Sequence, residues 1–132
     1  MKIESQKSTV NAPIDEVFKF LQNTENINEL LPQVEVKDFK GNEMECSFKV
    51  QGGITISLKQ DKLEAPQKIT MVSGEKSPFP FHLFIELSEK EGKTEGCIVF
   101  DGEVNAFLKM MVKKPLTNLF DYMSNSLKNK YA

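Results

Sequence analysis

The sequence predicts an α+β domain in which a curved antiparallel sheet is covered on one face by a long C-terminal helix. Two observations predict this class. Between residues 34 and 104, apolar residues recur at every second position in short runs that turn sequences separate, which is typical of antiparallel strands. From residue 105 onward, apolar residues recur every three or four positions, as along one face of a helix. The 132 residues are expected to form one domain over 1–132.

The N-terminal part predicts one strand and two short helices. Residues 2–11 form a weakly patterned strand. A helix is expected at 13–22, because Pro13 suits a first helical turn and the apolar residues that follow share one face, namely Ile14, Val17, Phe18 and Leu21. A second helical turn is expected at 25–31, and Pro32 ends it because proline has no N–H to donate.

Six further strands are expected, which gives seven strands with one apolar face. They are predicted at 34–40, 43–50, 54–59, from 69 onward, 81–88 and 94–104, and "QGG" at 51–53 is read as a turn. The alternation assigns His82 and Glu86 to the polar face, together with Glu43 and Glu45. A register error of one residue would turn His82 and Glu86 inward.

The chain is predicted to close on a long helix. Its apolar positions step by three or four residues through Leu108, Val112, Leu116, Leu119, Met123 and Leu127. Asn105 is expected to cap its N-terminus. Pro115 should kink this helix or begin its longer half, because it cannot donate to the carbonyl four residues back.

Composition and charge argue against several classes of function. All 17 basic residues are lysine and the net charge is −2, which argues against sequence-specific nucleic-acid binding and phosphoryl transfer, where arginine is the usual ligand. The sequence has no apolar run typical of a signal peptide or membrane span, so a cytoplasmic location is expected. Residues 106–132 carry five lysines against one aspartate. This segment is either a solvated helix face or a weak contact for an anionic membrane or acidic partner, through Lys109, Lys113 and Lys114.

The residues offer little for catalysis or metal binding. His82 is the single histidine, and Cys46 and Cys97 lack metal-ligand spacing, so we expect reduced thiols, no metal and no cofactor. An enzyme would need a general acid or base on the apolar face, and no such residue is predicted there. No catalytic residue is therefore assigned.

Three quoted segments resemble one superfamily. "NAPIDEVFKFLQN" is similar to the start, "FKVQGGITISLKQDKLEAPQKITMVSG" to the middle, and "VNAFLKMMVKKPLTNLFDYMSNSL" to the closing helix of START-like (SRPBCC) proteins. The bacterial branch with this resemblance includes polyketide cyclase, dehydrase and lipid-transport proteins and relatives of the carbon monoxide dehydrogenase G subunit. The resemblance covers nearly the whole chain and implies the helix-grip fold, with the element order β-α-α-β6-α.

The resemblance also implies a cavity between the sheet and the last helix that holds lipids or other apolar molecules. Ten phenylalanines and six methionines favour an adaptable apolar lining, although the same residues could fill a solid core. The expected lining comprises Phe48, Ile56, Met71, Leu83, Ile85, Phe100, Leu108, Val112, Leu116 and Met123. Asn105, Ser57 or Tyr122 would orient the ligand.

The loop "GEKSPFPFH" contributes two further candidates. Pro78 and Pro80 stiffen the chain around Phe79 and Phe81, which are expected either at the cavity mouth or as a cap on the core. The sequence thus predicts binding or carriage of an apolar small molecule or lipid. The alternatives are a cyclase- or dehydrase-like enzyme and an accessory or membrane-associated interaction module.

Overall fold

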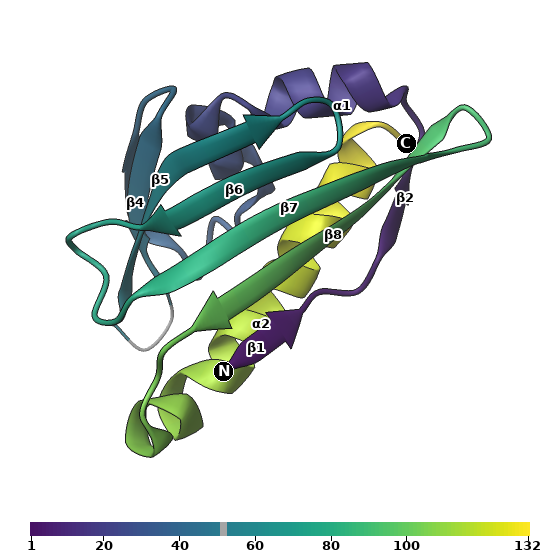
Figure 1. The fold of residues 1–132 in the computed structure, drawn as a ribbon. Helices are drawn as coiled ribbons and strands as arrows, with labels where there is room; N and C mark the ends of the chain where they lie inside the picture. The colour runs from purple at the N-terminus through teal and green to yellow at the C-terminus, as the bar shows by residue number, and fades with distance from the viewer. Residues whose placement is uncertain (51–52) are drawn as a thin grey trace.

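The computed structural model describes residues 1–50 and 53–132. Over these residues, an antiparallel sheet of eight strands curves around one long helix, α2 (Ala106–Lys130) (Figure 1). Helix α1 (Ile14–Leu21) packs against two strands of the sheet, and the 3-10 helix η1 (Thr24–Leu30) packs against α2. The predicted α+β fold, a curved antiparallel sheet with a long C-terminal helix, is confirmed.

The strands follow one another along the sheet with few exceptions. Their order is β1-β8-β7-β6-β5-β4-β3, and β2 also pairs with β8. Their bounds are β1 (Lys2–Glu4), β2 (Ser8–Val10), β3 (Lys37–Gly41), β4 (Glu45–Lys49), β5 (Thr55–Glu64), β6 (Lys68–Ser73), β7 (Phe81–Lys90) and β8 (Lys93–Gly102). From β3 to β8, each strand pairs with the next strand in the sequence. The strands β1 and β2 pair instead with β8, which lies far from them in the sequence.

The helices agree closely with the sequence pattern. Helix α1 begins after Pro13, and η1 ends just before Leu31 and Pro32. The Asn105 side chain caps α2, because its Oδ1 accepts a hydrogen bond of 2.9 Å from the backbone N–H of Leu108. Pro115 lies inside one continuous helix, so it does not begin a separate helix.

The edge strand β3 begins later than predicted. Residues 33–35 form a turn, and the backbone N–H of Val36 donates to Pro32 O at 2.9 Å. The pairing of β3 with β4 shifts register between Lys37 and Lys40, and Asp38 has a φ of 57° there. This edge is therefore short, charged and irregular. The turn predicted at 51–53 begins with Gln51 and Gly52, which lie outside the described residues.

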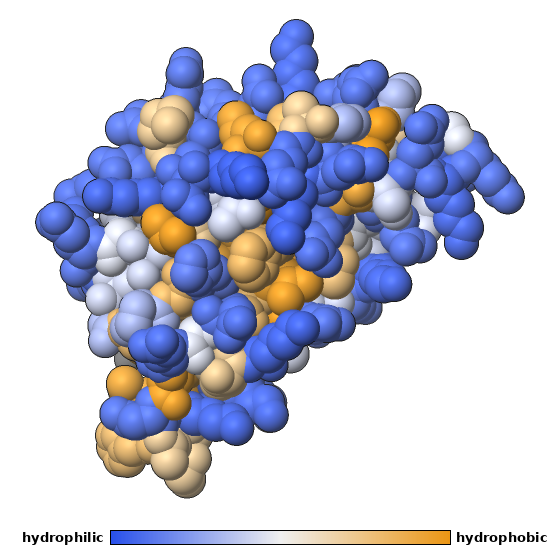
Figure 2. All heavy atoms as spheres, in the orientation of Figure 1, coloured by the Kyte–Doolittle hydropathy of each residue, from blue (hydrophilic) through white to orange (hydrophobic). Residues whose placement is uncertain are grey.

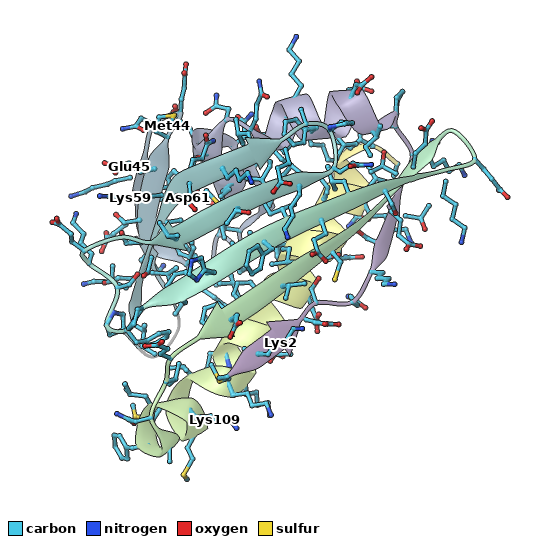
Figure 3. All side chains as sticks on the ribbon, viewed as in Figure 1. Lys2, Met44, Glu45, Lys59, Asp61 and Lys109 are labelled. Atoms are coloured by element: carbon cyan, nitrogen blue, oxygen red, sulfur yellow. The ribbon has the colours of Figure 1, made fainter. Side chains whose placement is uncertain are left out.

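The outer face of the sheet is mostly polar, as predicted. Glu45 on β4 lies opposite Lys59 on β5, and Figure 3 shows both at the end of the sheet remote from Lys109. His82 and Glu86 are exposed on this face, which confirms the predicted register of β7. Figure 2 also shows apolar groups on this face. Phe84 and Val99 pair across β7 and β8, and the ammonium group of Lys68 lies 4.6 Å from the centroid of the Phe84 ring.

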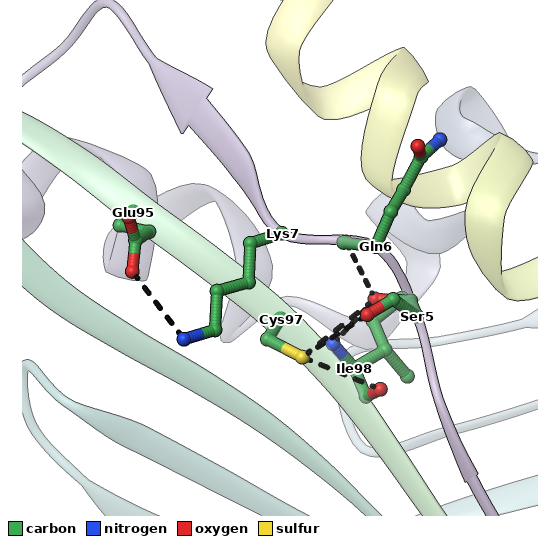
Figure 4. Close-up of polar contacts among 6 residues, drawn as sticks. All are labelled: Ser5, Gln6, Lys7, Glu95, Cys97 and Ile98. Atoms are coloured by element: carbon green, nitrogen blue, oxygen red, sulfur yellow. Dashed lines mark hydrogen bonds and ion pairs between the residues drawn. The ribbon is translucent and has the colours of Figure 1, made fainter.

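The predicted first strand is split in two, and this corrects the expected count of seven strands to eight. Between β1 and β2, Ser5 Oγ accepts a hydrogen bond of 2.9 Å from the N–H of Ile98 and donates to Gln6 O at 3.0 Å (Figure 4). The N–H of Gln6 turns away from β8 and donates to Asp121 Oδ1 on α2 at 2.8 Å. The break thus connects the sheet to the final helix. None of the helices in the described part of the chain has the length and apolarity needed to cross a bilayer.

Candidate functional site

The candidate site is the interior between the sheet and α2. Of the ten residues predicted to line it, nine are at most 5% exposed and belong to one continuous apolar core, namely Phe48, Ile56, Met71, Leu83, Ile85, Phe100, Val112, Leu116 and Met123. The tenth, Leu108, is half-buried and packs against the margin of this core. The structure therefore collects all ten residues in or beside the same interior.

This interior contains a small apolar cavity of about 20 Å³. It lies where α1, η1, β7, β8 and α2 meet, and its lining includes Leu21, Ile27, Leu30, Ile85, Leu87, Ile98, Met123 and Leu127, with Ser8 and Ser124 beside them. Of the ten predicted lining residues, Ile85 and Met123 alone border it. A volume of this size holds about one water molecule, whereas a pocket for a drug-sized ligand measures roughly 300–1,000 Å³. The expected ligand-sized cavity is therefore closed by side chains in this structure.

Phenylalanine rings fill another part of the interior. The Phe81 and Phe100 ring centroids are 5.0 Å apart, those of Phe100 and Phe120 are 5.6 Å apart, and Phe79 meets Phe100 edge-on at 6.2 Å. Phe79 and Phe81 are buried, so they do not stand at an open cavity mouth as one sequence interpretation expected. Both rings instead pack in the core near Phe100.

The three polar residues expected to orient a ligand lie elsewhere. Asn105 is exposed and caps α2, and Tyr122 is exposed. Ser57 is buried under the loop that follows β6, where its N–H donates to Ser77 Oγ at 2.9 Å. None of the three therefore faces the interior in this structure, and for Ser57 the sequence does not show that the loop after β6 covers the outer face of β5.

A buried pair of hydroxyl groups lies beside the cavity instead. Ser124 on α2 donates a hydrogen bond of 2.9 Å to Gln6 O, and its Oγ lies 3.0 Å from Ser8 Oγ on β2. Both serines border the cavity. Sequence reasoning missed this pair because serine at these positions looks like a solvated residue, and its partner lies 116 positions away.

The two halves of α2 are held in different ways. The second half is tied to the rest of the fold by polar contacts, which are Asp121 to Gln6, Ser124 to Gln6 and Ser8, and Lys130 to Glu29 at 3.4 Å. In the first half, the side-chain hydrogen bonds of the described residues stay within the segment, from Leu108 to Asn105 and from Thr117 to Lys113 O. Val112 and Leu116 attach this half through apolar packing. Pro115 also removes one hydrogen bond of the helix itself.

The buried polar groups of the described residues carry no charge. Among the described residues, the buried polar side chains are all serine or threonine. Cys46 is also buried, and burial, together with the charge of Glu45, raises the pKa of its thiol from 9.0 to about 12. This thiol therefore stays protonated and unreactive near neutral pH.

A comparison with protein families gives one match over most of the chain. The model of the family described as the CoxG subunit of carbon monoxide dehydrogenase matches residues 7–130. No curated protein sequence matches the chain.

Solved structures of low sequence identity share the fold. A START superfamily protein from Mycobacterium smegmatis is similar with a TM-score of 0.73 and 12% identity, covering 98% of this chain and 96% of that one. The Zhui aromatase/cyclase from a Streptomyces species also has a TM-score of 0.73, with 14% identity over 99% of this chain and 93% of its own. A protein from Thermus thermophilus has a TM-score of 0.73 and 13% identity, covering 99% and 97%. At these identities, the similarity shows the START-like fold.

Proposed function

Since this chain belongs to the CoxG family of carbon monoxide dehydrogenase subunits, we propose that it binds and carries an apolar small molecule or lipid between its sheet and α2. The observation that carries this proposal is the chemistry of the interior, where apolar side chains from both layers meet and the buried polar groups are uncharged. Such a surface attracts a ligand through burial of apolar area, at about 25 cal/mol per Å². The uncharged Ser8 and Ser124 would contact one polar end of such a ligand.

Binding requires the closed interior to open. We infer that the first half of α2 is the segment that moves, because its side-chain hydrogen bonds among the described residues stay within the segment and Pro115 interrupts the hydrogen bonding of the helix. A ligand would replace side-chain contacts with contacts of the same kind, since Met side chains repack readily around apolar groups. The ten interior residues would then form the lining of the occupied site, and Phe79 and Phe81 would border its entrance.

An enzymatic function of the cyclase or dehydrase kind has weaker support. A general acid or base must come within hydrogen-bond reach of its substrate. His82 and Glu86, the candidates that a register error would have turned inward, are exposed on the outer face. We therefore propose carriage of a ligand rather than its conversion.

The first test measures the mass of the protein after purification from the organism that produces it naturally. Native mass spectrometry of the protein purified from that organism without detergent is expected to show an adduct that organic solvent extracts. A clean unliganded mass, together with no uptake of the lipophilic dye Nile red above that of an unrelated globular protein, would contradict the proposal.

Variants locate the binding within the fold. The double substitution I85A/M123A enlarges the small cavity and is expected to tighten Nile red binding several-fold. Leu63→Ala, on the exposed end of β5, is the control and should leave binding unchanged. The double substitution F107S/M110S, at two exposed positions of α2, is a second control. It should abolish binding of dye to the surface of α2 but leave binding of dye in the interior unchanged.

A further inference from the structure

A polar hollow lies on the outer face of the sheet, on the side away from α2. It has a volume of about 340 Å³ over β4 and β5, and the connection between β6 and β7 borders it. Figure 1 shows this connection at the same end of the sheet as β4. Pockets for small molecules typically measure roughly 300–1,000 Å³. Unlike the cavity inside the core, this hollow is therefore large enough for a ligand.

Strand register and side-chain size produce the hollow. Lys40 on β3, Ser47 on β4 and Ser57 on β5 lie directly opposite one another across three neighbouring strands. Beyond β5, the backbone N–H of Gly74 donates to Ser57 O at 2.9 Å, so this glycine continues the row. The two serines and the glycine are small residues among longer polar ones, and they form the floor of the hollow.

The loop after β6 is fixed over this floor by its contacts with one residue of β5. The N–H of Ser57 donates to Ser77 Oγ at 2.9 Å, and Ser77 Oγ donates to Ser57 O at 3.1 Å. The close approach requires glycine at position 74, because a Cβ atom there would collide with Ser57 Oγ. These contacts place the next two residues of the loop, Glu75 and Lys76, at the margin of the hollow.

The hydroxyl of Ser57 has no hydrogen-bond partner in the described part of the chain, although its backbone N–H and C=O both do. Ser57 is 8% exposed and borders the hollow. Side-chain hydroxyls that are this buried are usually hydrogen-bonded, so this one is a group that a ligand can contact. Ser47 is half-buried directly opposite it, and Cβ atoms in such a pair are about 5 Å apart. The floor therefore presents two hydroxyl donors close enough to share one anionic group.

Three lysines stand at the margin of the hollow, namely Lys40, Lys59 and Lys76. The ion pairs of the described residues involve other lysines. Lys59 forms none even with Glu45, which lies directly opposite it in the register and beside it in Figure 3. The three ammonium groups outnumber the two carboxylates at the margin, those of Glu45 and Glu75. Ammonium and hydroxyl donors are the groups that bind an anion.

We propose that this hollow binds a small phosphorylated sugar or polyol. Near neutral pH, a phosphate monoester carries about −1.5 to −2 charges and three acceptor oxygens, which suit Lys40 and Lys76 together with the two serine hydroxyls. The glutamates would repel a second anionic group but accept hydrogen bonds from sugar hydroxyls. A nucleotide is less suitable, because the described residues that line the hollow include no aromatic ring on which a base could stack. This site lies across the sheet from the interior and does not depend on the carriage of an apolar ligand there.

Nuclear magnetic resonance titration of the full chain, labelled with ¹⁵N, tests the class of ligand. Glucose 6-phosphate is expected to shift the amide signals of Ser47, Ser57 and Lys76 saturably, with a dissociation constant below about 1 mM. Inorganic phosphate should bind several-fold more weakly, and glucose should cause no shift at these residues. The absence of a saturable shift with glucose 6-phosphate, or equal affinity for inorganic phosphate or glucose, would overturn the proposal.

Variants locate the binding on the outer face. The double substitution K40Q/K76Q should weaken binding of glucose 6-phosphate by about tenfold or more, because it removes two ammonium groups. Ser57→Ala keeps the backbone hydrogen bonds of this residue and should weaken binding several-fold through loss of the hydroxyl.

The matched control is K90Q/K93Q, which removes the same charge from a pair of exposed residues at the turn between β7 and β8. It should bind glucose 6-phosphate like the original protein. Because all four lysines are exposed, both double variants should keep the urea midpoint of the original protein. Equal affinity of the two double variants for glucose 6-phosphate would overturn the proposal.

Discussion

The hydroxyl of Thr94 donates a hydrogen bond of 2.8 Å to the carbonyl oxygen of Ala12, and the Thr94 side chain is completely buried. This bond joins the start of β8 to the residue that precedes the first turn of α1. It therefore fixes where α1 enters the fold, 82 positions away in sequence.

The bond predicts a specific loss of stability. Thr94→Val keeps the size of the side chain but leaves Ala12 O buried without its donor, so the free energy of unfolding should fall by about 1–3 kcal/mol. Thr94→Ser retains the hydroxyl and should lose less. Urea unfolding followed by circular dichroism measures both values, and equal losses for the two variants would show that the methyl group matters more than the hydrogen bond.

The packed phenylalanines predict an uneven response to truncation. Phe100 contacts Phe79, Phe81 and Phe120 and is almost fully buried, so Phe100→Ala should lower the free energy of unfolding by about 3–5 kcal/mol. Phe107→Ala removes an equally large but exposed ring and should change it by at most about 0.5 kcal/mol. Comparable effects in urea titrations would mean that the interior is looser than its contacts indicate.

The buried thiol of Cys46 predicts a dependence of stability on alkaline pH. Its pKa is about 12 in the folded chain and near 9 when unfolded, so between these values the unfolded state releases a proton that the folded state keeps. Its contribution to stability is complete below pH 9 and is lost as the pH rises toward 12. Between pH 9 and 10.5, the free energy of unfolding should fall more steeply than in Cys46→Ala, by about 1 kcal/mol per pH unit.

Comparison with Cys46→Ala is essential because the two proteins share every other contribution to the pH dependence of stability. Identical slopes for the two proteins would contradict the assignment. A thiol reagent gives an independent measurement. Cys97, which is less buried, should react in the folded protein, whereas Cys46 should react only after unfolding.

Local patterns predicted the elements whose residues alternate or repeat clearly. The apolar stripe of α2, its Asn105 cap and the outward position of His82 all follow from neighbouring residues in the sequence, and the structure agrees with them. The split of the first strand does not follow in this way. It depends on two hydrogen bonds between residues more than 90 positions apart in the sequence. The N–H of Ile98 donates to Ser5 Oγ, and the N–H of Gln6 donates to Asp121 Oδ1.

The interior was harder to predict for a related reason. A sequence shows which side chains face inward. Whether a cavity remains depends on whether the total volume of these side chains fills the space between the curved sheet and α2. Phe79 and Phe81 illustrate this, because their prolines suggested a stiff exposed loop, whereas the loop turns both rings onto Phe100. Phe107 and Met110 are exposed and do not belong to the series of apolar positions that predicted α2. Listing the apolar residues on the other face of the predicted helix would have identified them.

Both margins of the sheet are unsuited to strand addition. On one side, the outer edge of β3 is irregular. The register shifts between Lys37 and Lys40, and Asp38 has a left-handed backbone conformation, so the backbone N–H and C=O groups of this edge do not form a regular row. On the other side, β1 and β2 are three residues each and are separated by the break at Ser5. Copies of this chain that meet at high concentration therefore find a short and interrupted strand at each margin, which protects a β-rich protein against fibre growth.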